Sequence, residues 1–496
     1  MIGVSLGELA ALLGTGLTTA DPDVVVTSVV ADSRQVEPGA LFVALAGARS
    51  DGHDHVRGAV GDGAVGALTA RPVPAAPCLV VADPLAALGR LARLVVDRGT
   101  TGGLQVVGIT GSQGKTSTKD LLAQVLAEVG PTVAPVGNLN NELGVPLTAC
   151  RVDDSTRYLV SELGARGIGH IAYLCGIVAP RVGVVLNVGQ AHVGEFGGQA
   201  AIAQAKGELV EALPGEGWAV LNADDPLVWA MRSRTNAQVL AFAVGAPPAG
   251  GPALWAEDLR SDRLGRHAFT LHRRGADGAR GEAEVRLQLT GRHQVANAVA
   301  AAAAATAVGM GLTAIADALG RAGARSRWRM ELSERPDGVV VVNDAYNANP
   351  ESMRAAVATL AELGRAAGSG TWAVVGDMLE LGDATLAEHT DLGRHLAEQQ
   401  VSGVAAVGRH ADAVVDGAVS AGLDPAAALA TEDKEQARTW VADRLRPGDV
   451  VLVKASRGLA LDTVAEALAA ASGGPAAVPD PQPTAAEPAR PSEDPA

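Results

Sequence analysis

Aromatic side chains are scarce in this chain of 496 residues: they make up 3% of it, whereas hydrophobic residues as a whole make up 48%. Its buried cores must therefore be built mainly from valine, leucine and alanine. Cysteine is also scarce, and its three copies (Cys78, Cys150 and Cys175) lack metal-ligand spacing. An odd number of cysteines in a chain of this length excludes a disulfide framework. We expect the three thiols to be small buried hydrophobes in a reducing compartment.

Long apolar runs are missing as well. The longest, residues 295–308, is rich in alanine and carries Asn297. It is shorter than the roughly 20 residues that a membrane-spanning helix needs, so we expect a packed helix there. The first residues, MIGVSLGELAALLG, have neither the basic start nor the small-residue cleavage site of a secretory signal. These absences predict a cytoplasmic protein without stable membrane insertion.

Lysine is rare among the 40 basic residues, of which 35 are arginine. The five lysines are Lys115, Lys119, Lys206, Lys434 and Lys454. Because a primary amine does chemistry that a guanidinium cannot, some of them are candidates for sites where arginine would fail. A codon bias toward arginine would produce the same ratio. The net charge of −15 argues against a nucleic-acid partner, which calls for a basic face.

The length corresponds to two to four domains of about 100–200 residues each, and the pattern favours three. A Gly-Thr-Thr-Gly-Gly segment at 99–103 predicts the first boundary, and a linker that acts as a hinge is expected near 320–327. The last residues hold seven prolines and no aromatic residue, which predicts a disordered tail. The predicted units are residues 1–98, 99–322 and 323–470, followed by the tail at 471–496.

Strand-like apolar runs alternate with helical stretches through the second and third units. In sequence order the runs are Leu104–Ile109, Tyr158–Glu162, Val182–Val188, Trp218–Leu221, Val339–Asn343, Trp372–Gly376, Val404–Val407 and Val450–Lys454. Strands separated by helices favour parallel sheets with right-handed crossovers. We predict an α/β fold with a small N-terminal α/β domain, a central parallel-sheet P-loop domain and a C-terminal Rossmann-like domain. Residues 244–282 are expected to form a peripheral hairpin or loop.

Residues 108–116 read Gly-Ile-Thr-Gly-Ser-Gln-Gly-Lys-Thr, after an apolar strand and at the start of a helix. This is the context of a phosphate-binding loop, in a shorter GxxGKT form because Ile109 stands where the general pattern has glycine. Gly111 and Gly114 let backbone N–H groups turn toward phosphate oxygens. Lys115 is expected to reach the β- and γ-phosphates, and the Thr116 hydroxyl to bind Mg²⁺. The predicted loop also includes Ser112, Gln113 and Ser117. A glycine-rich turn without a ligand is the alternative.

Further segments resemble the Mur ligases, the ATP-dependent amide-forming enzymes of peptidoglycan synthesis. They occur in the family's order from residue 32 to residue 457. The segments are Asp32–Arg34, Pro38–Leu45, Asp51–His53, Gly111–Thr116, Gly137–Pro146, Glu162–Gly164, Ala191-His192, Glu195–Gly197, Ala205–Glu208, Gly291–His293, Asn297-Ala298, Arg329–Glu331, Asn343–Pro350, Gly376–Gly382 and Val453–Arg457. They cover all three predicted domains.

The resemblance implies a reaction in which ATP phosphorylates a carboxylate and an amine then attacks the acyl phosphate. Three segments are closest to the family member that adds a dipeptide: Asn138–Asn141, Asp344–Pro350 and Gly376–Gly382. The implied substrates are then UDP-N-acetylmuramoyl-tripeptide and D-alanyl-D-alanine. A sister ligase that adds the third stem amino acid is the near alternative, and a folylpolyglutamate-type ligase is a more distant one. A P-loop switch or transport ATPase is the rival from another class.

The resemblance also implies two Mg²⁺ ions and an unusual ligand. Glu162 and His192, each after a predicted strand, are the implied magnesium ligands with Thr116. A buried or surface histidine with an ordinary hydrogen bond is the alternative for His192. In the family, the lysine that matches Lys206 reacts with carbon dioxide to form a carbamate, which then serves as an anionic metal ligand; a solvated helix lysine is the alternative.

The remaining implied contacts involve ATP and the substrates. For ATP, Asn297 would lie near the adenine, Arg329 would close over the γ-phosphate with Arg327 as its rival, and Asp344 would contact the ribose beside Asn347. For the nucleotide sugar and its peptide, the residues are Asp32, Ser33, Arg34, Asn140 and Asn141. For the dipeptide, they are Lys454, Ser456 and Arg457. Lys119 and Lys434 are expected on exposed helix faces, and the protein is expected to be a monomer.

Overall fold

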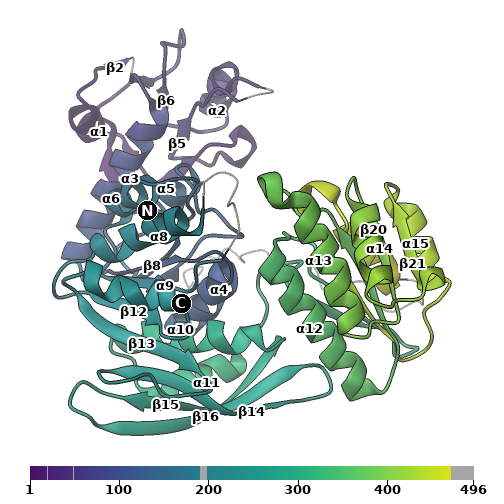
Figure 1. The fold of residues 1–496 in the computed structure, drawn as a ribbon. Helices are drawn as coiled ribbons and strands as arrows, with labels where there is room; N and C mark the ends of the chain where they lie inside the picture. Colours follow the sequence, from purple (N-terminus) through teal and green to yellow (C-terminus); the bar gives the residue numbers. More distant parts are fainter. Residues whose placement is uncertain (19, 48–49, 190–197, 471–496) are drawn as a thin grey trace, which may run out of the picture.

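The computed structural model describes residues 1–18, 20–47, 50–189 and 198–470. Its three layered α/β units follow the chain from purple through teal to yellow (Figure 1). Within the described residues, no helix is both long enough and apolar enough to cross a membrane. All three cysteines are buried and free, as predicted.

The N-terminal unit is built on a five-stranded sheet. The order is β2 (Leu17–Thr18), β7 (Cys78–Val80), β6 (Gly66–Thr69), β5 (Ala40–Val43) and β4 (Ser28–Val30). The short strands β1 (Val4–Ser5) and β3 (Val25–Val26) pair separately, and helices α1 (Leu6–Leu13) and α2 (Val56–Gly61) complete the unit. Helix α3 (Pro84–Thr101) includes much of the predicted boundary segment 99–103 and packs against the central unit as well. The first two units therefore share one hydrophobic core.

The central unit contains a nine-stranded sheet. Its order is β16 (Arg280–Thr290), β15 (Arg266–Arg274), β14 (Ala253–Ser261), β13 (Gln238–Val244), β12 (Trp218–Asn222), β11 (Val182–Val185), β8 (Gln105–Thr110), β10 (Tyr158–Glu162) and β9 (Thr132–Val133). The strands from β9 to β14 run parallel, as the alternation of strands and helices predicts. Residues 244–282 do form a hairpin, but it belongs to the main sheet: β14 pairs with β13 in parallel, and β15 and β16 extend the sheet by antiparallel pairing (Figure 1).

Helices cover both faces of the parallel part, because successive side chains along each strand point to opposite faces. On β8, Val106 contributes to one core and Val107 to the other. The first face carries α5 (Gly144–Ala149), α6 (His170–Val178) and α8 (Gln199–Glu211). The second carries α4 (Lys115–Ala127), α10 (His293–Ala307) and α11 (Leu312–Arg321). The alanine-rich run at 295–308 is thus a packed helix, as predicted.

The C-terminal unit is a second doubly covered sheet. Its order is β17 (Glu331–Glu334), β18 (Val340–Asn343), β22 (Val450–Lys454), β19 (Thr371–Gly376), β20 (Gly403–Val407) and β21 (Ala428–Thr431). Only β17, at the edge, is antiparallel to its neighbour. One face carries α12 (Pro350–Ala367), α13 (Thr385–Glu398) and α14 (Ala411–Ser420), and the other carries α15 (Lys434–Ala442) and α16 (Asp462–Ala470). The carboxyl ends of β18, β19 and β22 therefore share one edge of this sheet, where ligands bind in such folds.

Candidate functional site

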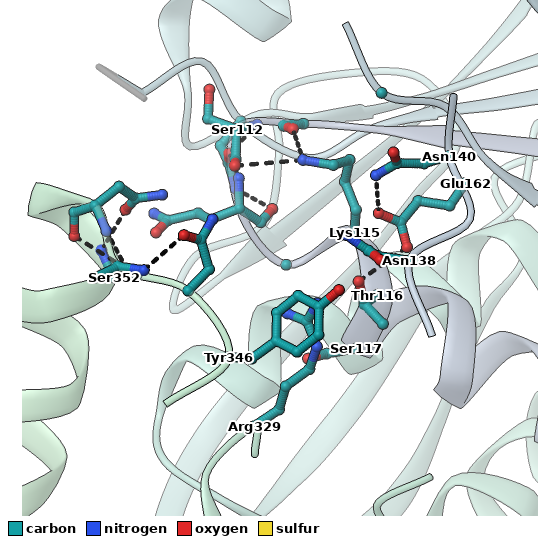
Figure 2. Close-up of a pocket in the computed structure, with 18 of the residues that line it drawn as sticks. Ser112, Lys115, Thr116, Ser117, Asn138, Asn140, Glu162, Arg329, Tyr346 and Ser352 are labelled. Carbon is teal, nitrogen blue, oxygen red and sulfur yellow. Dashed lines mark hydrogen bonds between the residues drawn. The ribbon is translucent and has the colours of Figure 1, made fainter. Parts of the chain in front are cut away.

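A pocket of about 730 Å³ lies between the carboxyl ends of the central and C-terminal sheets. Its central wall is the loop between β8 and α4, and its C-terminal wall comes from the segment before β17 and the segments after β18, β19 and β22 (Figure 2). Because the two walls belong to different units, the site is complete only when both units are in place. The segment 322–330, which includes part of the predicted hinge, joins them.

The loop at 111–114 has the conformation that a phosphate site requires. Gly114 caps α4 with φ +80°, a left-handed value that glycine adopts most easily. A Cβ on Gly114 would lie 2.4 Å from Asn297 Oδ1, and one on Gly111 would lie 2.9 Å from Leu186 Cβ. Close packing thus favours glycine at both positions, and backbone shape favours it at Gly114 as well.

Asn187, which sequence reasoning missed, shapes this loop from the neighbouring strand. Its Oδ1 accepts hydrogen bonds from the backbone N–H groups of Ser112 (2.9 Å) and Gln113 (3.0 Å). Its Nδ2 donates to Gln113 O at 3.2 Å. The sequence feature that could have identified Asn187 is its position two residues after β11. Glu162, at the end of β10, was selected because of a similar position.

Glu162 connects the P-loop helix to the loop before α5. The carboxylate is 1% exposed and accepts a hydrogen bond from Thr116 Oγ1 (2.9 Å) at Oε2 and from Asn140 Nδ2 (2.8 Å) at Oε1. Asn141 caps helix α5 by accepting from Gly144 N at 2.9 Å. The hydroxyl of Thr116 and the carboxylate of Glu162 are oxygen donors of the kind that Mg²⁺ prefers, and they lie side by side.

Two lysines, the half-buried Lys115 and the buried Lys206, face the same pocket. Lys115 Nζ donates to Gly111 O (2.6 Å), and burial lowers its pKa, an effect that Glu162 opposes and Arg329 reinforces. Lys206, on α8, is 6% exposed. Burial, reinforced by the charge of Lys115, holds the pKa of Lys206 well below its usual range. At neutral pH, a larger fraction of Lys206 is therefore present as the neutral amine than in a solvent-exposed lysine.

Arg329 reaches the pocket from the C-terminal unit. Its guanidinium lies over the ring of Tyr346, 4.1 Å from the centroid, and within the described residues its buried Nε has no hydrogen-bond partner (Figure 2). The flanking residues Trp328 (φ +59°) and Met330 (φ +53°) are left-handed. Their backbone N–H groups donate to Glu331 and Asp344. Such strained backbone is typical of functional segments.

Arg327 has a different environment from Arg329. It does not line the pocket, and its side chain is 55% exposed. Its guanidinium forms an ion pair with Glu466 at 2.9 Å and lies over the ring of Trp328. Of the two rivals for the phosphate contact, the geometry favours Arg329.

Lys454 is buried at the end of β22, where its main contacts are internal. Its Nζ forms an ion pair with Asp344 Oδ2 (2.6 Å) and donates to Asn347 O (2.8 Å). Ser456 Oγ accepts from Leu379 N, and Arg457 pairs with Asp462 at 2.6 Å. All of these except Asp462 line the pocket. Their packing makes Lys454 a support for Asp344 and Asn347, and its predicted contact with the dipeptide stays a prediction.

Asn297 meets the P-loop from helix α10. It is 7% exposed, its Nδ2 donates to Gln294 Oε1 (2.9 Å), and its Oδ1 accepts from Thr118 Oγ1 (3.3 Å). His293, at the start of the same helix, is half-buried, and loss of solvation lowers its pKa. Both residues line the pocket next to the phosphate loop.

The segment Asp32–Arg34 lies in the N-terminal unit, outside this pocket. Asp32 accepts from Arg34 Nη2 (2.6 Å) and Nε (2.9 Å), and this contact lowers the pKa of Asp32 to about 2. Arg34 is 87% exposed, and Ser33 begins the short 3₁₀ turn that Asp32 caps. His192 falls within 190–197, outside the described residues.

Asp377, His389 and His410 form a compact group of metal-ligand type among the described residues. Hydrogen bonds already use the ligand atoms of two of them: His389 Nε2 accepts from Met378 N (3.0 Å), and Asp377 accepts from the backbone N–H groups of Arg409 and His410. These bonds join the loops after β19 and β20, which gives Asp377 of the Gly376–Gly382 segment a structural role, whereas Leu379, Glu380 and Leu381 of the same segment line the pocket.

The fold and the pocket define a multidomain P-loop protein whose site is completed by residues of the C-terminal unit, among them Arg329, Lys454 and Arg457. Comparison with known proteins specifies the family. The Mur ligase family catalytic domain matches residues 25–94, the Mur ligase middle domain matches 109–305, and the Mur ligase glutamate ligase domain matches 328–457. The chain belongs to the Mur ligase family.

Individual relatives match almost the whole chain. UDP-N-acetylmuramoyl-tripeptide–D-alanyl-D-alanine ligase of Mycobacterium tuberculosis is 44% identical, over 95% of this chain and 98% of the relative. The crystal structure of MurF from Acinetobacter baumannii superposes with a TM-score of 0.83 and 32% identity, over 94% of this chain and 99% of the other. MurF ligase from Thermotoga maritima, solved in complex with ADP, gives a TM-score of 0.75 and 29% identity, over 90% and 97%.

Proposed function

We propose that this chain is an ATP-dependent ligase that joins D-alanyl-D-alanine to the peptide carboxylate of UDP-N-acetylmuramoyl-tripeptide, yielding the pentapeptide precursor of peptidoglycan. The observation that carries the proposal is the pocket in which a P-loop faces Arg329, Asp344 and Lys454. It occurs in a chain that aligns over almost its full length with ligases of that name.

The P-loop supplies the site for ATP. Backbone N–H groups at 111–114 and the N-terminus of α4 attract phosphate oxygens. Lys115 Nζ, which donates to Gly111 O in this structure, would turn to the β- and γ-phosphates. Asn297, which lines the pocket, would lie near the adenine, and Asp344 and Asn347, which line it from the C-terminal unit, would contact the ribose.

The oxygen donors of Thr116 and Glu162 fit a magnesium ion, and His192 and Lys206 complete the set proposed for two ions. When bound, Mg²⁺ neutralises negative charge on the phosphates. The lowered pKa of Lys206 supports its role as a carbamate, because only the neutral amine adds to carbon dioxide. In that reaction the amine nitrogen bonds to the carbon of CO₂ and releases a proton, which leaves an anionic oxygen ligand.

The ligase reaction makes two bonds in succession. A carboxylate oxygen of the tripeptide bonds to the γ-phosphorus while the bond to ADP breaks. The amine of D-alanyl-D-alanine then bonds to the acyl carbon, loses a proton and displaces phosphate. Lys115 and Arg329 place positive charge on the two sides of the pocket, where it stabilises the transferring phosphoryl group.

A panel of amine donors tests the proposal. Purified protein with ATP and Mg²⁺ is given either UDP-N-acetylmuramoyl-tripeptide or the matching dipeptide carrier, together with D-alanyl-D-alanine, D-alanine, L-lysine or meso-diaminopimelate. We expect phosphate release and a new product mass only with the tripeptide carrier and D-alanyl-D-alanine. Turnover of the dipeptide carrier with lysine or diaminopimelate would identify the sister ligase instead. ATP hydrolysis that needs no amine would favour a P-loop switch or transport ATPase.

A second experiment separates the two candidate arginines. Because Arg329 faces the phosphate site, we expect Arg329→Ala to lower kcat/KM for ATP by about 100-fold, the scale of losing one preorganised charge in a dry site. Arg327→Ala removes an exposed ion pair with Glu466 and a contact with the Trp328 ring, both outside the pocket contacts of Arg329, and should change kcat/KM for ATP by less than about threefold. Steady-state kinetics at saturating carrier and dipeptide measure both. The reverse order would assign the phosphate contact to Arg327.

A further inference from the structure

Lys119 is buried, contrary to the prediction that it lies on an exposed helix face. It follows Lys115 by one turn of α4, and its side chain is 2% exposed. Its Nζ lies 2.6 Å from Asp120 Oδ1 and donates to Pro135 O (2.9 Å) and Gly137 O (3.1 Å). Two of the three N–H donors of the ammonium group thus bond the loop carbonyls, and Asp120 balances its charge.

The two carbonyls belong to the loop at 134–143, which connects β9 to α5 and lines the pocket with Asn138, Asn140 and Asn141. Beyond Asn138 the loop is held by Asn140, whose side chain bonds Glu162 and whose carbonyl accepts from Gly164 N at 2.8 Å. Before Asn138, the nearest side-chain anchor is Lys119, at Gly137. Figure 2 shows Asn138 and Asn140 beside Glu162 and Lys115.

We propose that Lys119 is a positioning residue for the carrier substrate: it fixes residues 135–141 against the P-loop helix, so that Asn138 and Asn140 face the reacting carboxylate. This inference rests on the ligase function proposed above. Arginine would not serve equally well at this position. Its planar guanidinium is larger than an ammonium group, and it cannot bring its donors to the two carbonyls and the Asp120 carboxylate from a single buried nitrogen.

The nucleotide site has separate supports. Asn187 holds the backbone of Ser112 and Gln113, and neither bond involves the loop at 135–141. Loss of the Lys119 contacts should therefore affect the carrier more than ATP. A merely structural role would instead lower the fraction of active protein and leave both KM values unchanged.

The test compares Lys119→Met with Lys434→Met. Methionine keeps the length of the side chain but removes the donors. Lys434 is a matched control because its Nζ bonds Ala460 O and Thr463 Oγ1, and none of these three residues lines the pocket. We expect Lys119→Met to raise KM for UDP-N-acetylmuramoyl-tripeptide about tenfold, the scale set by leaving buried carbonyls unpaired. KM for ATP should stay within about twofold, as should both constants for Lys434→Met. Lys119→Arg should fall between wild type and Lys119→Met.

Hydrogen–deuterium exchange supplies a readout that does not require activity. In Lys119→Met we expect faster exchange of the amides at 136–141, with β8 unchanged. Equal increases in both KM values, or wild-type exchange in that loop, would overturn the inference. If the wild-type protein failed the donor panel, the proposed function would fall, while the exchange result would still decide whether Lys119 fixes the loop.

Discussion

Lys206→Arg is expected to lose ligase activity by about 100-fold or more while the protein stays folded, a loss on the scale of removing one preorganised charge-stabilising group. Arginine keeps the positive charge and most of the length of lysine, so a lysine that acted only as a cation would tolerate the change. A carbamate requires a neutral amine, and a guanidinium stays protonated in proteins. Burial and the neighbouring charge of Lys115 already hold the pKa of Lys206 low. Turnover with the tripeptide carrier and D-alanyl-D-alanine measures the loss.

Chemical rescue makes this prediction specific. Lys206→Ala opens space on α8 in the pocket wall, and added formate or acetate can place a carboxylate there. We expect part of the activity to return with either acid and none to return with chloride at equal ionic strength. Lys434→Arg is the matched control and should keep full activity, because Lys434 lies outside the pocket lining. Near-normal turnover in Lys206→Arg would rule out the carbamate.

The parts of the molecule that local sequence determines were predicted well. The loop at 111–116 lies between β8 and α4 as expected, because its glycines and the flanking apolar strand are contiguous in the chain. The strands that carry Glu162, Asn343 and Lys454 at their ends agree with the predicted runs within one residue. Such buried parallel strands are apolar along their whole length, and the helices between them fix their direction.

Properties that depend on distant segments were not predictable in this way. Lys119 is buried beside the loop that carries Pro135 and Gly137, whose carbonyls accept its hydrogen bonds. The sequence of helix α4 alone does not reveal this contact. Lys454 is paired with Asp344, 110 residues away, so a strand-end lysine that looked free for a substrate is largely occupied. The polar stretch at 244–282 was predicted to form a hairpin, but its pairing with β13 was not. That pairing depends on which strand of the folded sheet has an unpaired edge, and the local sequence does not show this. Of the five lysines, the structure thus places four in buried or part-buried contacts around one pocket and the loop beside it.

Gly114→Ala is expected to abolish measurable nucleotide binding, with a loss of at least about 100-fold in affinity for ATP. A left-handed alanine costs about 1–2 kcal/mol in backbone energy alone. Its Cβ would also lie 2.4 Å from Asn297 Oδ1, so either the phosphate loop or Asn297 must move. Both are parts of the proposed ATP site, and the backbone N–H groups that face the phosphates depend on the position of this loop. Isothermal titration with ATP or ADP measures the effect without requiring catalysis.

Gly176→Ala is the matched control for this substitution. Gly176 lies inside helix α6, its φ is not left-handed, and a Cβ there meets no atom within 4 Å. Alanine in a helix is favoured over glycine by roughly 0.5–1 kcal/mol, so this variant should bind ATP normally and unfold at the same or a slightly higher temperature. ATP binding by Gly114→Ala within about threefold of wild type, a difference of under about 1 kcal/mol, would show that the loop has room for a side chain and that its glycine is not required by the nucleotide. If Gly114→Ala loses ATP binding and Gly176→Ala does not, the result would support a phosphate site formed by the backbone at Gly114, next to Asn297.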